Sequence, residues 1–305
     1  MATPVISLSP AAATELARAA LGRLLTVTAL RPLHGGMVNA VQEWATDGEP
    51  PLIVAKLCPD PADVFRHEFE TLRWYRARTR FPVPEPYGCL AGAGGFPGSC
   101  LLMQRLPGRN LAEAGLTEAG RRHFEEELAG FVADLHEHRR GAYGSALGGE
   151  ALPRWLDWFA PKIQYNFERS AARLSPSARG VTEKLLADLG AWLPECARPT
   201  LVHGDLWATN ILVDDADADR PRITGFVDGG ANYADPEYEL AYLRVFRTAG
   251  REFLRAYATR HPLREGFERR CRVYWLNTML LHLWFFGDEY APSCERLAAE
   301  VARLA

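Results

Sequence analysis

Leu-Val-His-Gly-Asp-Leu-Trp-Ala-Thr-Asn occupies positions 201–210, and Phe-Val-Asp follows at 226–228. A short apolar run at 211–213 directly follows the first segment, and a second run at 223–227 overlaps the other. The polar stretch 214–222 between them contains a proline and is rich in turn-forming residues. Two apolar runs that are split by a turn-rich segment predict a β-hairpin.

The predicted hairpin brings oxygen-bearing side chains together at its open end. Antiparallel pairing places the start of one strand beside the end of the other, so Asn210 and Asp228 are expected to be neighbours. Asp205 lies on the loop that leads into the hairpin. Carboxylate and amide oxygens suit a hard divalent cation such as Mg²⁺, whose remaining ligands are commonly substrate phosphates. The segment therefore predicts a magnesium–nucleotide site.

Length and composition describe an ordinary globular chain. With 305 residues it can bury a sizeable core in one or two domains. The net charge of −3 gives no electrostatic reason to expect nucleic acid or an anionic membrane as partner. The six cysteines have no paired metal-ligand spacing and are interpreted as reduced thiols. The oligomeric state is left open.

No targeting or membrane segment is predicted. The N-terminus lacks a basic region followed by an apolar core, and residues 11–21 instead predict an amphipathic helix with Ser9 as N-cap and Pro10 at its first position. The longest apolar stretch, 274–287, is interrupted by polar residues and is too short to span a bilayer. We expect a soluble, cytoplasmic protein.

The pattern of apolar residues changes about one third of the way along the chain. Up to about residue 103 it favours strands, with one helix at 61–78; the expected strands are 24–33, 39–45, 52–57 and 100–103. After Leu106 it favours helices, at 118–137, 153–174, 177–193, 236–245 and 267–287. The sequence thus predicts an α+β protein with two lobes: a small β-rich N-terminal lobe at 1–105, which binds nucleotide, and a larger helical lobe at 106–305, which carries the catalytic and substrate residues.

Lys56 is a candidate phosphate-binding residue. Lysine is scarce, and Lys56 ends the apolar run Leu-Ile-Val-Ala, which is typical of a strand. A lysine that projects from a sheet into a cleft provides a compact charge for nucleotide phosphates, whereas the alternative is a solvated strand end. Glu68 lies on the helix that follows and would hold the ammonium in place. The glycine pair Gly35-Gly36 joins two predicted strands and could lie over the phosphates, although such a pair is usually only a turn.

Other catalytic motifs are missing from the sequence. There is no Gly-x-x-x-x-Gly-Lys-Ser/Thr loop, which disfavours a P-loop enzyme, and no Gly-x-Ser-x-Gly elbow, which disfavours an α/β-hydrolase. His203 is interpreted as a residue that fixes the loop presenting Asp205 rather than as a general base. Asp205 itself could orient a substrate hydroxyl and accept its proton. Trp207, beside it, is a candidate for the substrate pocket.

Together these residues resemble the aminoglycoside phosphotransferase superfamily, which has a protein-kinase-like fold. The resemblance covers most of the chain and rests on His203-Gly-Asp205-x-x-x-x-Asn210, then Asp228, then Asp-Pro-Glu-Tyr-Glu-Leu-Ala at 235–241. It implies that Asp205 is the catalytic aspartate and that Asn210 and Asp228 are the magnesium ligands. All three occur in the family's order, which makes the motif specific.

The same resemblance assigns a nucleotide site to the first lobe. Lys56 matches the family's phosphate-binding lysine and Glu68 its partner glutamate. Gln104 to Leu106 match the connector that binds adenine. The implied cofactors are ATP and Mg²⁺, and the implied enzyme is a phosphotransferase with an alcohol group as acceptor.

Within the superfamily the chain looks most like the fructosamine (ketosamine) kinases. His-Gly-Asp-Leu-Trp at 203–207 is typical of that branch, as are the spacing from Asp228 to the 235–240 motif and the segment 280–290. Three features depart from it. Asp228 is followed by Gly-Gly, where that branch usually has Pro-Ala, and both Asp235-Pro236 and Leu-Pro-Gly at 106–108 resemble aminoglycoside enzymes.

The leading hypothesis is therefore ATP-dependent phosphorylation of a hydroxyl on a sugar-like or amine-bearing molecule, most simply a ketosamine. Acidic residues that could attract a cationic substrate are Asp235, Glu237, Asp288 and Glu289, each of which could instead be a solvated or helix-capping carboxylate. The alternatives are an antibiotic O-phosphotransferase and an inactive kinase-like binding module. A protein kinase is disfavoured because residues 229–234 leave no room for a peptide-docking activation segment.

Overall fold

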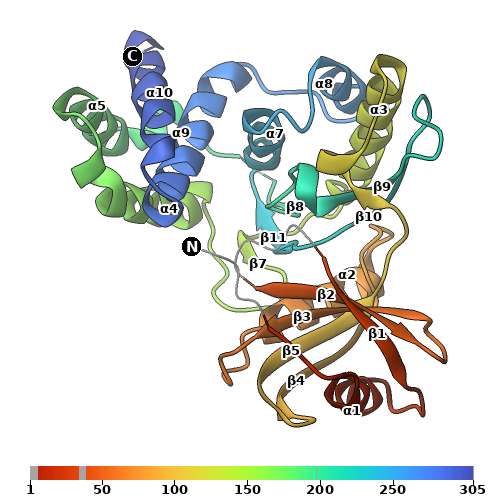
Figure 1. Cartoon of the computed structure of the whole chain (residues 1–305). Helices are drawn as coiled ribbons and strands as arrows, with labels where there is room; N and C mark the ends of the chain where they lie inside the picture. The colour runs from red at the N-terminus through yellow and green to blue at the C-terminus, as the bar shows by residue number, and fades with distance from the viewer. Residues whose placement is uncertain (1–5, 34–38, 197, 305) are drawn as a thin grey trace. The chain divides into compact units, whose positions relative to one another are not determined.

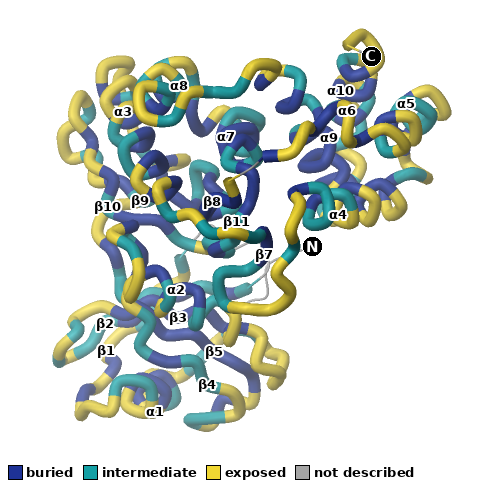
Figure 2. Tube along the Cα trace, turned by 180° about the vertical axis from the view of Figure 1, so that it is seen from behind, coloured by how far each residue is buried: buried dark blue, intermediate teal, exposed yellow. Residues whose placement is uncertain are grey.

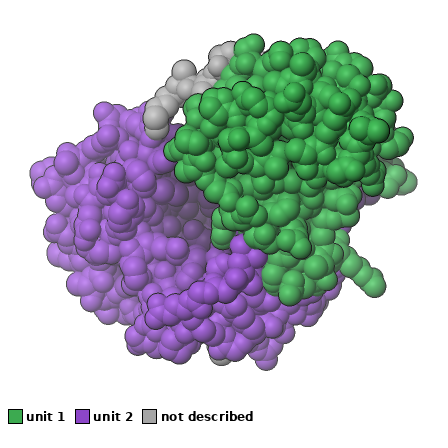
Figure 3. Space-filling model, turned by 90° about the horizontal axis from the view of Figure 1, so that it is seen from below, with its two compact units in different colours: residues 1–116, 209–229 green, residues 117–208, 230–305 purple. Residues whose placement is uncertain are grey.

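The computed structural model of the chain describes residues 6–33, 39–196 and 198–304. The chain forms two compact units (Figure 3). The first, which we call the sheet unit, comprises Met1–Leu116 and Thr209–Gly229; the second, the helical unit, comprises Thr117–Ala208 and Gly230–Ala305. These boundaries differ from the expected division at residue 105, because the 209–229 segment belongs to the sheet unit.

A five-stranded antiparallel sheet forms most of the sheet unit (Figure 1). Its strand order is β1-β2-β3-β5-β4, with bounds β1 (Val27–Pro32), β2 (Ala40–Thr46), β3 (Leu52–Cys58), β4 (Pro86–Ala93) and β5 (Phe96–Gln104). Four of these strands were expected from the sequence. β4 was not, because it begins at a proline and contains two glycines and two alanines that carry little strand signal.

One face of this sheet is covered by α1 (Pro10–Leu21). The predicted N-cap is confirmed: the Ser9 hydroxyl accepts a hydrogen bond from the Ala12 backbone N–H at 3.2 Å. Ile53, Ala55 and Leu57 of β3 join α1 in the apolar core. Since strand side chains alternate between faces, Val54 and Lys56 lie on the other face of the sheet.

The predicted hairpin is confirmed. β9 (Ile211–Asp214) pairs antiparallel with β10 (Arg222–Phe226), and Ile211 lies opposite Phe226. The two-residue strand β6 (Arg109–Asn110) adds to the other edge of β9. At the open end the Val227 backbone N–H donates to the Asn210 carbonyl oxygen at 3.0 Å, which fixes the spacing of the two chain segments that carry Asn210 and Asp228.

The helical unit has α9 (Phe267–Phe285) at its centre, buried along most of its length (Figure 2). It packs against α4, α7 and α10. The helices of this unit are α3 (Glu118–Leu135), α4 (Trp155–Ser170), α5 (Pro176–Ala187), α6 (Leu189–Trp192), α7 (Pro236–Val245), α8 (Arg251–Ala258), α9 and α10 (Ala291–Leu304). A small sheet in the order β7-β11-β8 completes the unit; its strands are β7 (Gly144–Ser145), β8 (Thr200–Val202) and β11 (Asn232–Ala234).

The predicted α+β class is confirmed, with some differences among the helices. The expected helix at 177–193 is two helices, because Asp188 leaves the helical region with φ −127° and ψ 38°. α8 and α10 were not expected from the sequence. None of the helices in the described parts of the chain is long and apolar enough to cross a bilayer.

Candidate active site

Lys56 is held between two carboxylates in the sheet unit. Its ammonium nitrogen Nζ lies 2.6 Å from Glu68 Oε1 and also donates to Asp228 Oδ1. Glu68 comes from α2 (Arg66–Arg78), and Asp228 follows β10. The lysine–glutamate contact expected from the sequence is therefore present, and Asp228 is a second partner. The roles of the three residues in binding a nucleotide remain predictions.

The surroundings of Lys56 keep it charged. Burial alone would lower the pKa of this lysine, but the neighbouring Glu68 and Asp228 carboxylates outweigh burial and raise its pKa above the ordinary value. The pKa of Glu68 is raised, mainly by burial, and Lys56 opposes that rise. A buried cation with acidic partners is thus available to a polyanionic ligand.

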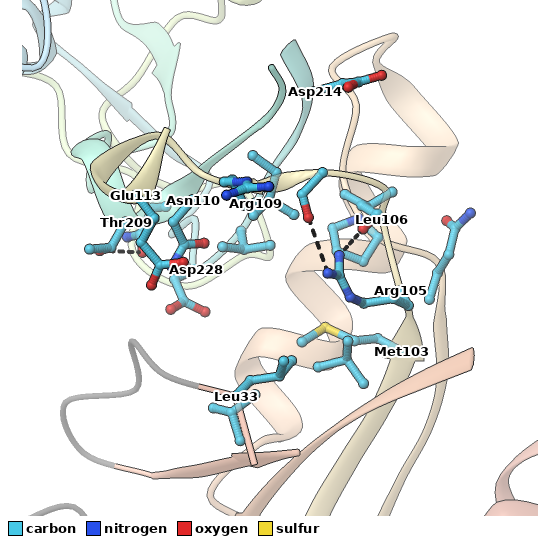
Figure 4. A pocket seen from close by; sticks show the side chains of 18 of the residues that line it. Leu33, Met103, Arg105, Leu106, Arg109, Asn110, Glu113, Thr209, Asp214 and Asp228 are labelled. Atoms are coloured by element: carbon cyan, nitrogen blue, oxygen red, sulfur yellow. Dashed lines mark hydrogen bonds between the residues drawn. The ribbon is translucent and has the colours of Figure 1, made fainter. Parts of the chain in front are cut away.

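A cavity of about 810 Å³ opens beside this cluster (Figure 4). Its walls include Val54 and Lys56 of β3, together with Gln104 and Leu106 of the connector after β5. Asn210 and Asp228 line it as well, from the hairpin. All the lining residues belong to the sheet unit. The glycine pair Gly35-Gly36, expected to cover phosphates, lies outside the described residues.

Asn210 and Asp228 present the donor types that a hard cation takes. Asn210 is almost fully buried, whereas the Asp228 side chain is about two-fifths exposed. Asp228 has φ 63°, a left-handed conformation that non-glycine residues adopt uncommonly and that aspartate tolerates better than most. An amide oxygen and a carboxylate on one cavity wall fit a Mg²⁺ that arrives with phosphate oxygens.

The connector after β5 is held firmly by its own hydrogen bonds. The Gln104 backbone N–H donates to the Glu85 carbonyl at 2.8 Å, and the Gln104 side-chain oxygen accepts from the Glu85 N–H at 3.2 Å. The Arg105 guanidinium donates to the Leu106 carbonyl and reaches Glu43 at 2.8 Å. These bonds fix the backbone that the sequence predicted to contact adenine.

Asp205 lies in the helical unit, on the loop after β8. The Tyr242 hydroxyl of α7 donates a hydrogen bond to Asp205 Oδ1. The Asp205 backbone N–H donates to His203 Nδ1 at 3.3 Å, and its carbonyl accepts from the Trp207 N–H at 3.1 Å. His203 is fully buried, so the structure agrees with its interpretation as a residue that shapes this loop.

A buried chain of polar groups anchors the same loop to the helices. The Gly204 N–H donates to Glu239 Oε1 at 2.7 Å. The other Glu239 oxygen lies 2.9 Å from His136 Nε2, and His136 Nδ1 lies 2.7 Å from the Tyr257 hydroxyl. Glu239 and His136 are essentially inaccessible to solvent, so these bonds fix the loop that carries Asp205.

Aromatic rings surround this part of the helical unit. The Phe246 ring centroid lies 4.9 Å from that of Tyr242, 6.1 Å from that of Trp207 and 5.2 Å from that of His282. The Trp207, Tyr242 and Phe246 side chains are only partly buried. Trp207, a predicted substrate residue, is thus part of a partly exposed aromatic surface beside Asp205.

Two of the predicted substrate residues make buried contacts within the protein. Asp235 is fully buried; it caps α7 through the Glu237 N–H at 2.9 Å and binds Arg264 and the Tyr274 hydroxyl. Glu237 is also buried and is shared by Arg264 and Arg270. Both carboxylates are already paired within the protein, which favours the structural alternative over contact with a cationic substrate; that contact stays a prediction. The Asp288 side chain is mostly exposed, and its contact with substrate stays a prediction.

Sequence reasoning missed several residues at these sites. Asn110 and Glu113 line the cavity because β6 and the short 3₁₀ helix η1 (Leu111–Glu113) follow the connector. Leu-Pro-Gly at 106–108 predicts a turn. The residues that follow such a turn could therefore have been considered as candidates for the cavity wall. Tyr242 had no such signal, since its contact with Asp205 depends on how α7 packs.

The antiparallel sheet with its buried lysine, the hairpin and the aspartate loop define a phosphotransferase with a kinase-like fold. The sequence profile of the Phosphotransferase enzyme family matches residues 29–274, and the chain belongs to this family.

Among individual relatives, the ketosamine-3-kinase of Mus musculus is 26% identical over 85% of this chain and 90% of its own length. A protein of Enterococcus faecium assigned as a ketoamine kinase is 35% identical, but the match covers only 34% of this chain and 36% of that protein. The predicted resemblance to ketosamine kinases is thereby confirmed.

Solved structures share the fold. A protein of Thermobifida fusca assigned as a fructosamine-3-kinase aligns with a TM-score of 0.70 at 22% identity, over 94% of this chain and 97% of that one. A mutant aminoglycoside phosphotransferase, solved with AMP-PNP and hygromycin B, aligns with a TM-score of 0.68 at 19% identity, over 91% and 94% of the two chains. At these identities the likeness shows the fold, and it confirms the predicted kinase-like class.

Proposed function

We propose that this protein is an ATP- and Mg²⁺-dependent kinase that transfers the γ-phosphate to a hydroxyl of a small ketosamine. The observation that carries the proposal is Lys56, buried between Glu68 and Asp228 on the wall of the 810 Å³ cavity. A cavity of this volume is in the range that binds small molecules and cofactors. A charged lysine fixed by a glutamate is the arrangement that kinases use to hold nucleotide phosphates.

The other cavity residues take complementary roles in this proposal. The backbone of Gln104 to Leu106 contacts the adenine ring. Asn210 and Asp228 hold Mg²⁺, which neutralises charge on the β- and γ-phosphates when it is bound. Asp228 then shares its carboxylate between the cation and Lys56, and Lys56, Asn210 and Asp228 all line the same cavity.

Asp205 acts on the acceptor. It precedes Asn210 by five residues, so the chain leads directly from the aspartate loop to a proposed magnesium ligand. Asp205 orients the acceptor hydroxyl and receives its proton. The acceptor oxygen forms a bond to the γ-phosphorus, the bond from that phosphorus to the β,γ-bridging oxygen breaks, and ADP leaves.

The choice of a ketosamine rests on the named relatives and on the helical unit. An aminoglycoside is a polycation and calls for several carboxylates, but Asp235 and Glu237 are buried in ion pairs with arginines. The side chains beside Asp205 are instead the aromatic Trp207, Tyr242 and Phe246. Aromatic faces pack well against a sugar ring and tolerate a single nearby amine.

A direct test is an acceptor screen with the native chain, ATP and MgCl₂. The panel contains fructosyl-glycine and ribulosyl-glycine as ketosamines and kanamycin as an aminoglycoside, and ³¹P NMR detects the phosphorylated product. We expect phosphorylation of a ketosamine with kcat/KM at least about a hundredfold above that for kanamycin, and loss of the reaction when EDTA removes Mg²⁺. Phosphorylation of kanamycin without any ketosamine would overturn the assigned acceptor class, and no transfer to any acceptor would favour an inactive binding module.

A further inference from the structure

Tyr242 is a side chain of α7 that bonds to the carboxylate of the aspartate loop. Its hydroxyl donates to Asp205 Oδ1, and its ring packs edge-to-face on Phe246 with centroids 4.9 Å apart. The start of α7 is fixed by the buried Asp235 cap, so the helix presents the hydroxyl from a firmly held element. No part of the proposed reaction requires a tyrosine at this position.

Other titratable groups of the helical unit also lie near this pair. Five groups make a hydrogen bond, a ring contact or an electrostatic interaction with the aspartate loop, with Tyr242 or with the Phe246 ring. They are His203, Tyr238, Glu239, His282 and Tyr290. His203 and Glu239 act on the backbone of the loop through the Asp205 and Gly204 N–H groups. Tyr242 is therefore the group in this set that is shown bonded to the Asp205 carboxylate.

The hydroxyl of Tyr242 stays a donor over the working pH range. Burial raises its pKa well above the ordinary value, and the neighbouring Asp205 charge raises it further. A hydrogen bond donated to a carboxylate favours the ionised form of that carboxylate. It also restricts rotation of the carboxylate, because the tyrosine ring is held in place by Phe246.

We propose that Tyr242 is a positioning residue for phosphoryl transfer: its hydroxyl orients the Asp205 carboxylate and keeps it ionised, so that the other oxygen meets the acceptor hydroxyl. The inference rests on the proposed function, in which Asp205 is the acceptor's base. It goes further because it assigns a role to a side chain that the family motif does not contain.

The test compares Tyr242→Phe with Tyr238→Phe. Tyr238 lies one turn earlier on α7, and burial and the Asp205 charge raise its pKa to about 12, yet among the described residues its hydroxyl has no hydrogen bond to Asp205. With ATP and fructosyl-glycine, Tyr242→Phe is expected to lower kcat about tenfold and leave KM for ATP unchanged. In the pH profile of Tyr242→Phe, kcat is expected to start falling at a higher pH than in the native chain as the solution is acidified. The reason is that Asp205 loses the hydrogen bond that favours its ionised form. Tyr238→Phe should match the native chain in both respects.

A second readout needs no acceptor and keeps the two proposals separable. Asp205 is titrated by NMR in chains labelled with ¹³Cγ-aspartate, and its signal is assigned through Asp205→Asn. The pKa of Asp205 should be higher in Tyr242→Phe than in the native chain and in Tyr238→Phe. An unchanged titration in Tyr242→Phe, or a kcat equal to that of the native chain, overturns the positioning role. If the titration shifts while no acceptor is phosphorylated, the proposed function fails and the link between Tyr242 and Asp205 remains.

Discussion

Lys56 contacts two carboxylates, and they come from segments at very different distances along the chain. Alternation along β3 places it on the face opposite the α1 core, and its position at the end of the apolar run brings it to α2. The contact with Glu68 could be predicted because one strand and the next helix provide both groups. The contact with Asp228 depends on pairing between segments more than 170 residues apart, which no local pattern reports.

Replacing Lys56 by methionine removes the charge while it keeps most of the side-chain volume. We expect kcat/KM for ATP to fall about 10²–10³-fold, because a fixed cation at the phosphates is lost. Lys184→Met is the matched control, since Lys184 is exposed on α5, and it should leave the steady-state kinetics unchanged. A native value of kcat/KM in Lys56→Met would show that Lys56 does not bind the nucleotide phosphates.

Asp235 and Glu237 mark a limit of prediction at the residue level. Sequence identifies them as carboxylates near the catalytic motif, but it does not show that Arg264 and Arg270 neutralise them. Those arginines lie about thirty residues away, before and within α9. Burial and pairing, which depend on tertiary packing, decide between a structural and a substrate-binding carboxylate.

At the scale of elements, helix α7 and its N-cap connect the loop with the helical core. In Asp235→Ala the cap is lost and Arg264 loses a buried partner, so we expect the free energy of unfolding in urea to fall by about 3 kcal/mol. Glu118→Ala, at an exposed residue on α3, should change it by less than about 0.5 kcal/mol. Unchanged stability of Asp235→Ala, together with a tenfold higher KM for the acceptor, would instead support contact between Asp235 and the substrate.

Strand β10 passes unusually close to the connector at Gly225. A Cβ there would lie 2.4 Å from Leu106 Cδ1 and 3.0 Å from the Pro82 carbonyl oxygen, and the β9–β10 register shifts at the same place. Any side chain at this position would displace Leu106, which lines the cavity, or the backbone at Pro82. Most of this close approach could not be predicted, since Gly225 in the sequence suggests only a bulge.

Gly225→Ala is therefore expected to weaken nucleotide binding. We expect KM for ATP to rise about three- to tenfold and stability to fall by about 1–3 kcal/mol, because Leu106 and the backbone near Pro82 must move. Gly180→Ala is the matched control: it lies inside α5 with open space around it, and it should raise stability by up to about 1 kcal/mol. Native KM and stability in Gly225→Ala would show that the connector tolerates the displacement.

For the whole molecule, the hairpin, the α+β class and most elements followed from hydrophobic periodicity. α8 and α10 were missed although both are amphipathic, because short or terminal segments without clear caps give a weak signal. The division into units also differed from the expected one, since pairing of β9 with β6 joins the hairpin to the sheet unit. The order of elements along the chain does not predict that β6 and β9 pair.

The central claim is that the chain carries out phosphoryl transfer through Asp205. The most direct measurement follows transfer of the γ-phosphate from ATP to fructosyl-glycine by the native chain and by Asp205→Asn, which keeps the shape of the side chain and removes its charge and basicity. We predict a phosphorylated ketosamine with the native chain and a rate at least about 10²-fold lower with Asp205→Asn. Equal rates of transfer by the two proteins would contradict the account.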